Sequence, residues 1–192
     1  MIAIINYQAG NTTSVKNTLD KLGYESLITD NHHLIESAKK VILPGVGEAK
    51  TAMKYLVETG LEKVIKRLKQ PVLGICLGQQ LLCKYSEEGN TTCLGIFDAQ
   101  VKKFPPLDIV PHMGWNNLSF NEHPIFEKFK KKQDVYFVHS YYCEINKNTL
   151  ATCDYILPFS AIMQKDNFYA MQFHPEKSGD VGEQLLLNFL KL

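Results

Sequence analysis

Short apolar runs alternate with amphipathic stretches in the first half of the chain. Each run spans four or five residues, which is typical of a strand buried on both faces of a sheet. The three runs are residues 2–5, 40–43 and 71–75. Between them Val15, Leu19 and Leu22 recur at helical spacing, and residues 49–57 and 61–68 are amphipathic in the same way. Strands that alternate with helices predict βαβ units, and therefore a parallel sheet with helices on both faces.

The second half has a different pattern, in which short strands are separated by turn residues. Lys165, Asp166 and Asn167 fit a hairpin turn between the last two strands, and residues 180–190 form a closing helix. Asp180 and Glu183 have the spacing of a capping box for that helix. The predicted strands are residues 94–104, 118–120, 135–138, 151–156, 159–164 and 168–173. We therefore expect one domain over residues 1–192, an α/β fold whose doubly wound, mostly parallel sheet is flanked by helices and carries an antiparallel β extension.

Composition supports a globular chain and excludes several other classes. The 192 residues are 45% hydrophobic and 21% charged, which excludes disorder, collagen and a disulfide-stapled small protein. The formal net charge is +1, so there is no electrostatic argument for a nucleic-acid partner or an anionic membrane. Arg67 is the only arginine, so bidentate recognition of phosphate by guanidinium is almost unavailable.

The cysteines and the N-terminal residues indicate a cytoplasmic protein. The chain has five cysteines, an odd number with no C-x-x-C pair, which argues against a disulfide framework or a structural zinc site. Residues 1–6 form an apolar run without a basic region or cleavage site, as expected of a buried strand rather than a signal peptide. No stretch reaches the roughly 18 apolar residues that a membrane helix needs.

Cys76 differs from the other cysteines because glycines flank it at a strand-to-helix transition. The apolar run 71–75 leads into residues 74–78, Gly-Ile-Cys-Leu-Gly, and a helical pattern follows at once. This is the cysteine form of a nucleophile elbow, a turn too tight for bulky neighbours. Unpaired N–H groups there, that of Leu77 first, favour a thiolate and can stabilise an oxyanion. We predict that Cys76 is a nucleophile and that the other four cysteines are buried apolar side chains.

His174 is the best candidate for the proton shuttle that such a nucleophile needs. It follows the apolar run 168–173, at the end of a strand where open α/β sheets collect their sites. Glu176 lies two residues on, so both side chains project to the same side of an extended segment. A carboxylate beside an imidazole fixes its tautomer and stabilises the imidazolium. The sequence therefore predicts a triad of Cys76, His174 and Glu176.

The remaining polar motifs carry weaker signals. Residues 44–47, Pro-Gly-Val-Gly, fit either a loop whose backbone approaches a ligand or a plain strand-to-helix turn. No histidine pair has the spacing of metal ligands, so we expect no metal and no cofactor. Two groups are predicted to be solvated surface: the histidines His32, His33 and His123, and the lysines Lys128, Lys130, Lys131 and Lys132.

Taken together, these motifs resemble the class I, or triad, glutamine amidotransferases. The elbow at residues 74–80 and the His-Pro-Glu segment at 174–176 carry the resemblance to the superfamily. A second, more specific set of motifs is similar to those of the glutaminase subunits of imidazole glycerol phosphate synthase. That set comprises Asn6, Tyr7, Gly10 and Asn11, residues 44–47, residues 111–116 (Pro-His-Met-Gly-Trp-Asn), residues 136–141 (Tyr-Phe-Val-His-Ser-Tyr) and residues 174–179.

The resemblance implies hydrolysis of glutamine to glutamate and ammonia. It implies that Cys76 is the nucleophile, His174 the general base and then acid, and Glu176 the residue that orients His174. It also implies that the ammonia passes to a cyclase partner with a (β/α)₈ barrel, forming a heterodimer for histidine biosynthesis. The other roles implied are an oxyanion hole from Val46, Gly47 and Leu77, glutamine binding by Gln80, Glu88, Ser140 and Tyr141, and a partner interface at Asn11 and Trp115. Gln8 departs from the glycine expected in the 6–11 loop.

Three alternatives remain open from the sequence. A paralogous glutaminase could supply ammonia to a sugar-amidination synthase for surface glycans, because the triad is the same for either partner. A cysteine peptidase would use the same catalytic residues, although nothing indicates a peptide groove. An inactive binding subunit would keep the fold alone, and the intact Cys76, His174 and Glu176 argue against it.

Overall fold

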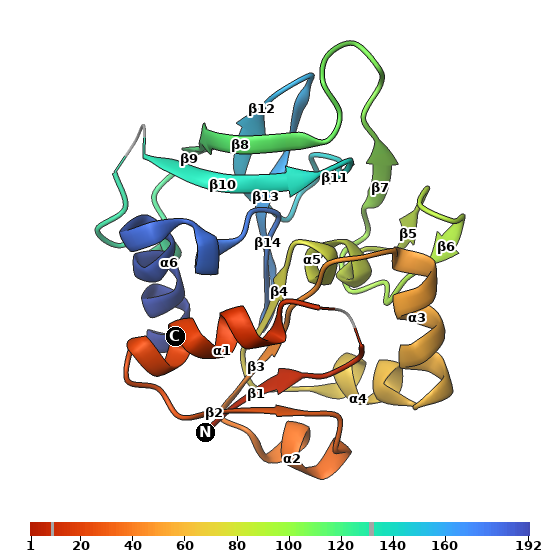
Figure 1. The fold of residues 1–192 in the computed structure, drawn as a ribbon, viewed down its shortest axis with the longest axis vertical. Coiled ribbons are helices and arrows are strands. Elements are labelled where there is room, and N and C mark those ends of the chain that lie inside the picture. The colour runs from red at the N-terminus through yellow and green to blue at the C-terminus, as the bar shows by residue number, and fades with distance from the viewer. Residues whose placement is uncertain (9, 131–132) are drawn as a thin grey trace.

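A computed structural model describes residues 1–8, 10–130 and 133–192, and it is dominated by one large mixed sheet (Figure 1). The strands run in the order β2-β1-β3-β4-β14-β13-β12-β9. The first five are parallel to their neighbours, and the last three pair antiparallel. Their bounds are β1 (Ile2–Ile5), β2 (Ser26–Thr29), β3 (Lys40–Leu43), β4 (Val72–Ile75), β9 (Ser119–Phe120), β12 (Thr149–Asp154), β13 (Pro158–Lys165) and β14 (Phe168–Met171).

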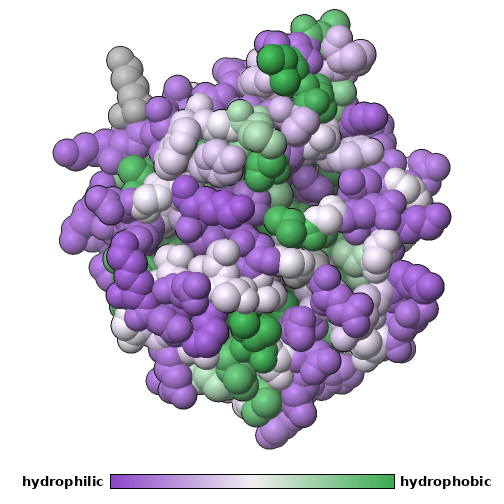
Figure 2. All heavy atoms as spheres, viewed as in Figure 1, coloured by the Kyte–Doolittle hydropathy of each residue, from purple (hydrophilic) through white to green (hydrophobic). Residues whose placement is uncertain are grey.

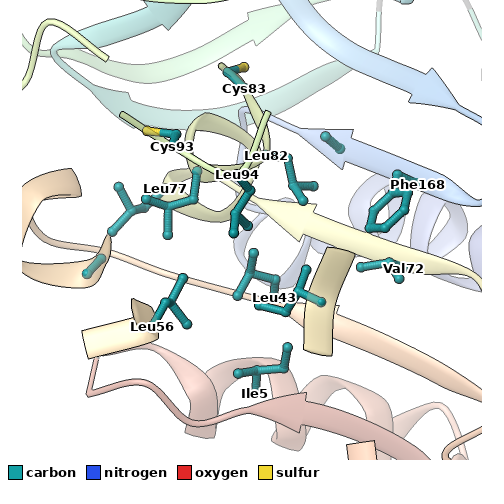
Figure 3. Close-up of a cluster of buried hydrophobic side chains, with 14 of the residues drawn as sticks. Ile5, Leu43, Leu56, Val72, Leu77, Leu82, Cys83, Cys93, Leu94 and Phe168 are labelled. Carbon is teal, nitrogen blue, oxygen red and sulfur yellow. The ribbon is translucent and has the colours of Figure 1, made fainter. Parts of the chain in front are cut away.

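Helices cover both faces of the sheet, and each face has its own apolar core. In β1, Ala3 and Ile5 point into one core, whereas Ile2 and Ile4 point into the other. Side chains alternate along a strand, so a strand buried on both faces must be apolar throughout. Figure 3 shows the first core, where the helices α3, α4 and α5 contribute leucines. The helices are α1 (Thr12–Lys21), α2 (His32–Ser37), α3 (Ala49–Glu58), α4 (Leu61–Arg67), α5 (Leu77–Leu82) and α6 (Gly179–Lys191).

The rest of the chain forms two small sheets and two 3₁₀ turns beside the large sheet. A ribbon of two antiparallel strands, β8 and β10, and a four-stranded sheet in the order β11-β7-β5-β6 lie toward the carboxyl ends of the parallel strands (Figure 1). The bounds are β5 (Tyr85–Ser86), β6 (Thr91–Thr92), β7 (Gln100–Lys103), β8 (His112–Asn117), β10 (Asp134–His139), β11 (Tyr141–Cys143), η1 (Pro124–Phe126) and η2 (Pro175–Lys177).

Several details differ from the sequence-based expectation. Of the predicted strand 94–104, only Gln100–Lys103 is extended, because the segment before it folds under α5 through backbone bonds from Leu94 and Phe97. His32 begins helix α2 and His33 lies within it, and both are exposed, as predicted. The capping box is absent, since α6 begins at Gly179 and its N-cap Ser178 makes no side-chain cap bond. Lys128 and Lys130 are exposed as expected, and Lys131 and Lys132 lie outside the described residues.

Register along the centre of the sheet brings two distant segments side by side. β4 and β14 are parallel neighbours, and Ile75 pairs with Met171 at their carboxyl ends. The Cys76 N–H then donates to the Met171 carbonyl oxygen at 2.8 Å. The residue after each strand therefore enters the same space above the sheet, so that Cys76 and Gln172 become neighbours although 96 positions separate them.

Gly78 lets helix α5 lie directly on strand β3. A Cβ at this position would overlap the Leu43 carbonyl oxygen, and backbone cannot move aside as a flexible side chain can. Gly78→Ala should therefore lower the free energy of unfolding by roughly 3 kcal/mol, the upper part of the range for overpacking. Urea denaturation measures the change. Gly95→Ala is the matched control, because Gly95 has a positive φ of 71° but open space around it; equal losses in the two variants would contradict the overlap.

Candidate active site

Cys76 lies at the junction of β4 and α5 in a strained backbone conformation. Its φ of 51° and ψ of −106° fall outside the regions that side chains other than glycine usually adopt. The side chain is buried, with 6% of the residue exposed. Such strain persists only where the surroundings impose it, and here the strand on one side and the packed helix on the other do so. The turn presents the sulfur at the carboxyl edge of the sheet, as the elbow motif predicts.

His174 and Glu176 form a buried hydrogen-bonded pair beside Cys76. His174 Nδ1 lies 2.7 Å from Glu176 Oε1, and both side chains are inaccessible to solvent. His174 Nε2 is buried without a hydrogen-bond partner among the described residues, so this nitrogen is available to a reacting group. Burial lowers the pKa of His174, but the Cys76 sulfur and the Glu176 carboxylate outweigh it and raise the pKa to about 10. At neutral pH the ring is therefore an imidazolium.

An open cavity of about 340 Å³ lies over Cys76. Every residue predicted for the oxyanion hole or for glutamine binding lines it. Burial raises the pKa of Glu88, whose Oε2 accepts the Ala49 N–H at 2.7 Å and so joins the cavity wall to the start of α3. The lining residues are Val46, Gly47, Cys76, Leu77, Gln80, Glu88, Pro111, Val138, His139, Ser140 and Tyr141. The volume suits a ligand of amino-acid size rather than an extended peptide.

Comparison with known proteins places this site in a family. The profile described as Glutamine amidotransferase class-I matches residues 3–192. The chain is 55% identical over 194 residues to the imidazole glycerol phosphate synthase subunit HisH of Bacteroides fragilis (strain YCH46), covering 100% of this chain and 99% of that protein. The chain belongs to the class I glutamine amidotransferases, in the HisH family. The HisH of Pasteurella multocida is 50% identical over 192 residues, covering 99% of this chain and 97% of that protein.

Solved structures confirm the predicted α/β fold class of this amidotransferase. One titled a glutamine amidotransferase superposes with a TM-score of 0.79 at 21% identity and covers 100% of this chain and 98% of its own. A glutamine amidotransferase from Thermotoga maritima gives a TM-score of 0.71 at 16% identity and covers 99% of this chain and 96% of its own. At such low identity these matches show the fold alone.

The backbone groups predicted to form an oxyanion hole in this amidotransferase include one N–H that is already hydrogen-bonded. The Leu77 N–H, expected as the first donor, donates to the Gly45 carbonyl oxygen at 3.3 Å. In the segment 44–47, the Pro44 carbonyl oxygen accepts a hydrogen bond from the Tyr7 hydroxyl. The pKa of Tyr7 is raised, mainly by burial and also by the nearby Cys76. Gly47 has a φ of 115°, where a Cβ would be strained. A change in the Gly45–Gly47 backbone is therefore needed before the Leu77 N–H can bind an oxyanion.

The two residues predicted at a partner interface lie in different places. Trp115 on β8 is 58% exposed and packs its ring edge-on against Tyr136. Asn11, in contrast, turns its side chain inward, and its Nδ2 donates to Glu176 Oε1 and lies 3.4 Å from His174 Nδ1. The structure thus places Asn11 against the buried acid–base pair.

Other large apolar side chains on β8 and in the loop before it are also exposed. Met113 lies two positions before Trp115 on the same face of β8, and Leu107 and Ile109 lie in the loop between β7 and β8. Figure 2 shows hydrophobic surface on that loop at the top of the molecule. No helix in the described part of the chain is long and apolar enough to cross a membrane.

Sequence reasoning missed one residue that contacts the sulfur directly. Gln172 is fully buried, and its Nε2 lies 3.6 Å from Cys76 Sγ. A polar side chain inside the apolar run 168–173 was the available signal, because a buried amide needs hydrogen-bond partners in the interior. His139 was also given no role, although it is one of the residues that line the cavity, and burial lowers its pKa to about 3.

Proposed function

We propose that this chain is the glutaminase subunit of an imidazole glycerol phosphate synthase and supplies ammonia for histidine biosynthesis. The observation that carries the proposal is 55% identity along the whole chain to a protein named imidazole glycerol phosphate synthase subunit HisH. Relatives down to 43% identity carry the same name, which favours this pathway over sugar amidination. The cavity over a buried Cys, His and Glu supports hydrolysis of a small amide.

In the first half-reaction Cys76 attacks the side-chain amide carbon of glutamine. The thiolate forms a carbon–sulfur bond, and the carbonyl electrons move to oxygen, giving a tetrahedral oxyanion. The Leu77 N–H and the backbone at Val46 and Gly47 then stabilise that oxygen. His174 has the raised pKa of an imidazolium, so it can protonate the departing nitrogen as ammonia leaves. The product is a γ-glutamyl thioester on Cys76.

In the second half-reaction water attacks the thioester. His174, now neutral, accepts a proton from the water, and the carbon–sulfur bond breaks to release glutamate and restore the thiolate. Glu176 holds Nδ1 protonated, so Nε2 faces the reacting atoms in both steps. Gln80, Ser140 and Tyr141 line the cavity where the glutamine backbone would be held, and the Glu88 carboxylate suits its ammonium group.

The partner in this proposal is a cyclase subunit with a (β/α)₈ barrel, which receives the ammonia before it reaches solvent. The exposed side chains of Met113 and Trp115 on β8 are suited to a protein interface, because large exposed aromatic and aliphatic side chains mark such sites. Asn11 connects the loop that precedes α1 to Glu176, so contacts made by that loop can reach the acid–base pair.

The decisive experiment combines the purified chain with the cyclase encoded in the same genome and gives the complex ¹⁵N-amide glutamine. We expect glutamate release and incorporation of ¹⁵N into an imidazole ring built from the nucleotide substrate. A label found in an amidinated sugar would identify the paralogous pathway instead. Hydrolysis of peptide amides in preference to glutamine would indicate a peptidase and overturn the proposal.

The isolated chain should hydrolyse glutamine slowly. Its Leu77 N–H is occupied by the Gly45 carbonyl, and loss of one oxyanion donor costs on the order of 10²–10³ in rate. We expect the cyclase with its nucleotide ligand to raise kcat by a similar factor, because it favours the loop conformation that frees the donor. Coupled detection of glutamate measures both states. Equal turnover with and without the loaded partner would rule out a loop switch.

A further inference from the structure

Among the residues that the structure describes, Gln172 is the amide side chain hydrogen-bonded to the sulfur of Cys76. It follows β14 directly, is completely buried, and places Nε2 3.6 Å from Cys76 Sγ, within hydrogen-bond distance for sulfur. Its Oε1 lies 3.1 Å from Gln80 Nε2. Both ends of the amide are therefore engaged, one with the nucleophile and one with the wall of the cavity.

A chain of hydrogen bonds fixes which end of Gln172 faces the sulfur. The Tyr141 carbonyl oxygen can only accept, and it does so from His139 Nδ1 at 2.7 Å and from Gln80 Nε2 at 3.0 Å. Gln80 Nε2 uses its second hydrogen toward Gln172, so Gln172 must present its oxygen to Gln80. The NH₂ group of Gln172 is then left to donate to Cys76.

At the other end of this series of hydrogen bonds, at His139 and His112, the direction of each bond is fixed in the same way. Burial lowers the pKa of His139 to about 3 and that of His112 to about 4, so both rings are neutral at physiological pH. With its Nδ1 hydrogen on the Tyr141 carbonyl, His139 accepts at Nε2 from His112 Nδ1, 3.1 Å away. Each donor has one available direction, so reversing the Gln172 amide would bring two donors or two acceptors together.

We propose that Gln172 is a further catalytic residue, which donates an N–H to the Cys76 thiolate and holds the sulfur ready before glutamine binds; this rests on the function proposed above. The protonated thiol has a different partner, since Cys76 Sγ can donate to the Val138 carbonyl oxygen at 3.9 Å. A thiolate is repelled by that carbonyl and attracted by the amide. The two contacts therefore differ between the protonation states: the Gln172 amide serves the thiolate and the Val138 carbonyl serves the thiol.

Other ionisable groups also act on the sulfur and must be held constant in a test. His174 faces Cys76 from the segment after β14 and is backed by Glu176; Tyr7 faces it from the loop after β1. His139 on β10 interacts electrostatically with His174, and burial lowers its pKa to about 3, so it is neutral. None of these is altered by a substitution at Gln172, so a change in thiolate reactivity can be assigned to the amide.

The test uses alkylation of Cys76 by iodoacetamide in the full chain, followed by mass spectrometry of its peptide across pH. Gln172→Met keeps the size and removes the donor. Hydrogen bonds to charged groups are strong enough to shift the midpoint of the pH–rate profile upward by about one unit, with alkylation about tenfold slower on the acidic side of the midpoint. Gln79→Met is the control: Gln79 is equally buried, but its Nε2 donates to the Ser160 carbonyl oxygen. It should lower stability without moving the midpoint.

Gln172→Glu keeps the proposal falsifiable if the methionine variant fails to fold. A glutamate can still accept from Gln80, but it brings negative charge to the sulfur, so the midpoint should rise at least as far. A wild-type midpoint in a folded Gln172 variant would overturn the assignment. Glutamine hydrolysis by the wild-type complex is scored separately, so an inert Gln172 and an inactive enzyme give different results.

Discussion

Replacing Cys76 with alanine should abolish glutamine hydrolysis while leaving the complex with the partner intact. Removal of a nucleophile in a triad costs on the order of 10⁴–10⁶ in kcat. The substitution deletes one sulfur from a buried position, and 6% exposure leaves almost no surface for a partner to contact. Glutamate release from the assembled complex measures the first effect, and size-exclusion chromatography of the mixture measures the second.

Cys153→Ala is the matched control for this loss. Cys153 is also buried, on β12, and burial raises its pKa to about 12, so its thiol is protonated at neutral pH. The control should retain activity and lose only some stability. Hydrolysis that persisted in Cys76→Ala at more than about 1% of the wild-type rate would point to a different nucleophile, since removing the attacking atom leaves far less.

The architecture was predictable because its signals are local. Residues 2–5, 41–43 and 71–75 are apolar, as strands buried on both faces must be, and the three predicted runs became β1, β3 and β4 with nearly the predicted bounds. β2 was not expected, because Ser26–Thr29 lies at the sheet edge and has only two apolar residues, with a polar residue at each end. Edge position is set by pairing with other strands, and a local pattern does not report it.

The same distinction between local and long-range signals separates the predictable residues of the candidate site from the others. Glycine is required beside Cys76 because a larger side chain does not fit: a Cβ at Gly74 would lie 2.7 Å from Leu82 Cδ1. The elbow is therefore visible in the sequence. Gln172 and Asn11 act across the fold, over 96 and 165 positions. Their roles depend on the register of β4 with β14 and on the direction of hydrogen bonds. Neither residue belongs to a periodic pattern in the sequence that would have revealed its role.

The largest effect expected away from the sulfur is that of Glu176→Gln. The carboxylate accepts from His174 Nδ1 at 2.7 Å and is fully buried, so it stabilises the imidazolium with little screening by solvent. Glutamine is the same size but neutral, and its NH₂ group can face Nδ1 and impose the wrong tautomer. We expect kcat to fall about 10³–10⁴-fold, as for the orienting carboxylate of serine proteases. Glutamate release by the complex measures it, with Glu183→Gln on α6 as a surface control of equal charge change.

A second measurement separates this electrostatic role from a packing role. The pKa of His174 is raised from 6.5 to about 10, so the protonated ring stabilises the folded chain below pH 6.5 and that contribution is lost as pH rises toward 10. Without the Glu176 charge, the midpoint of the His174 imidazole titration by NMR should fall, and the loss of stability should begin at lower pH. Because a packing defect would lower stability equally at every pH, an unshifted midpoint in Glu176→Gln would show that the carboxylate acts only through its shape.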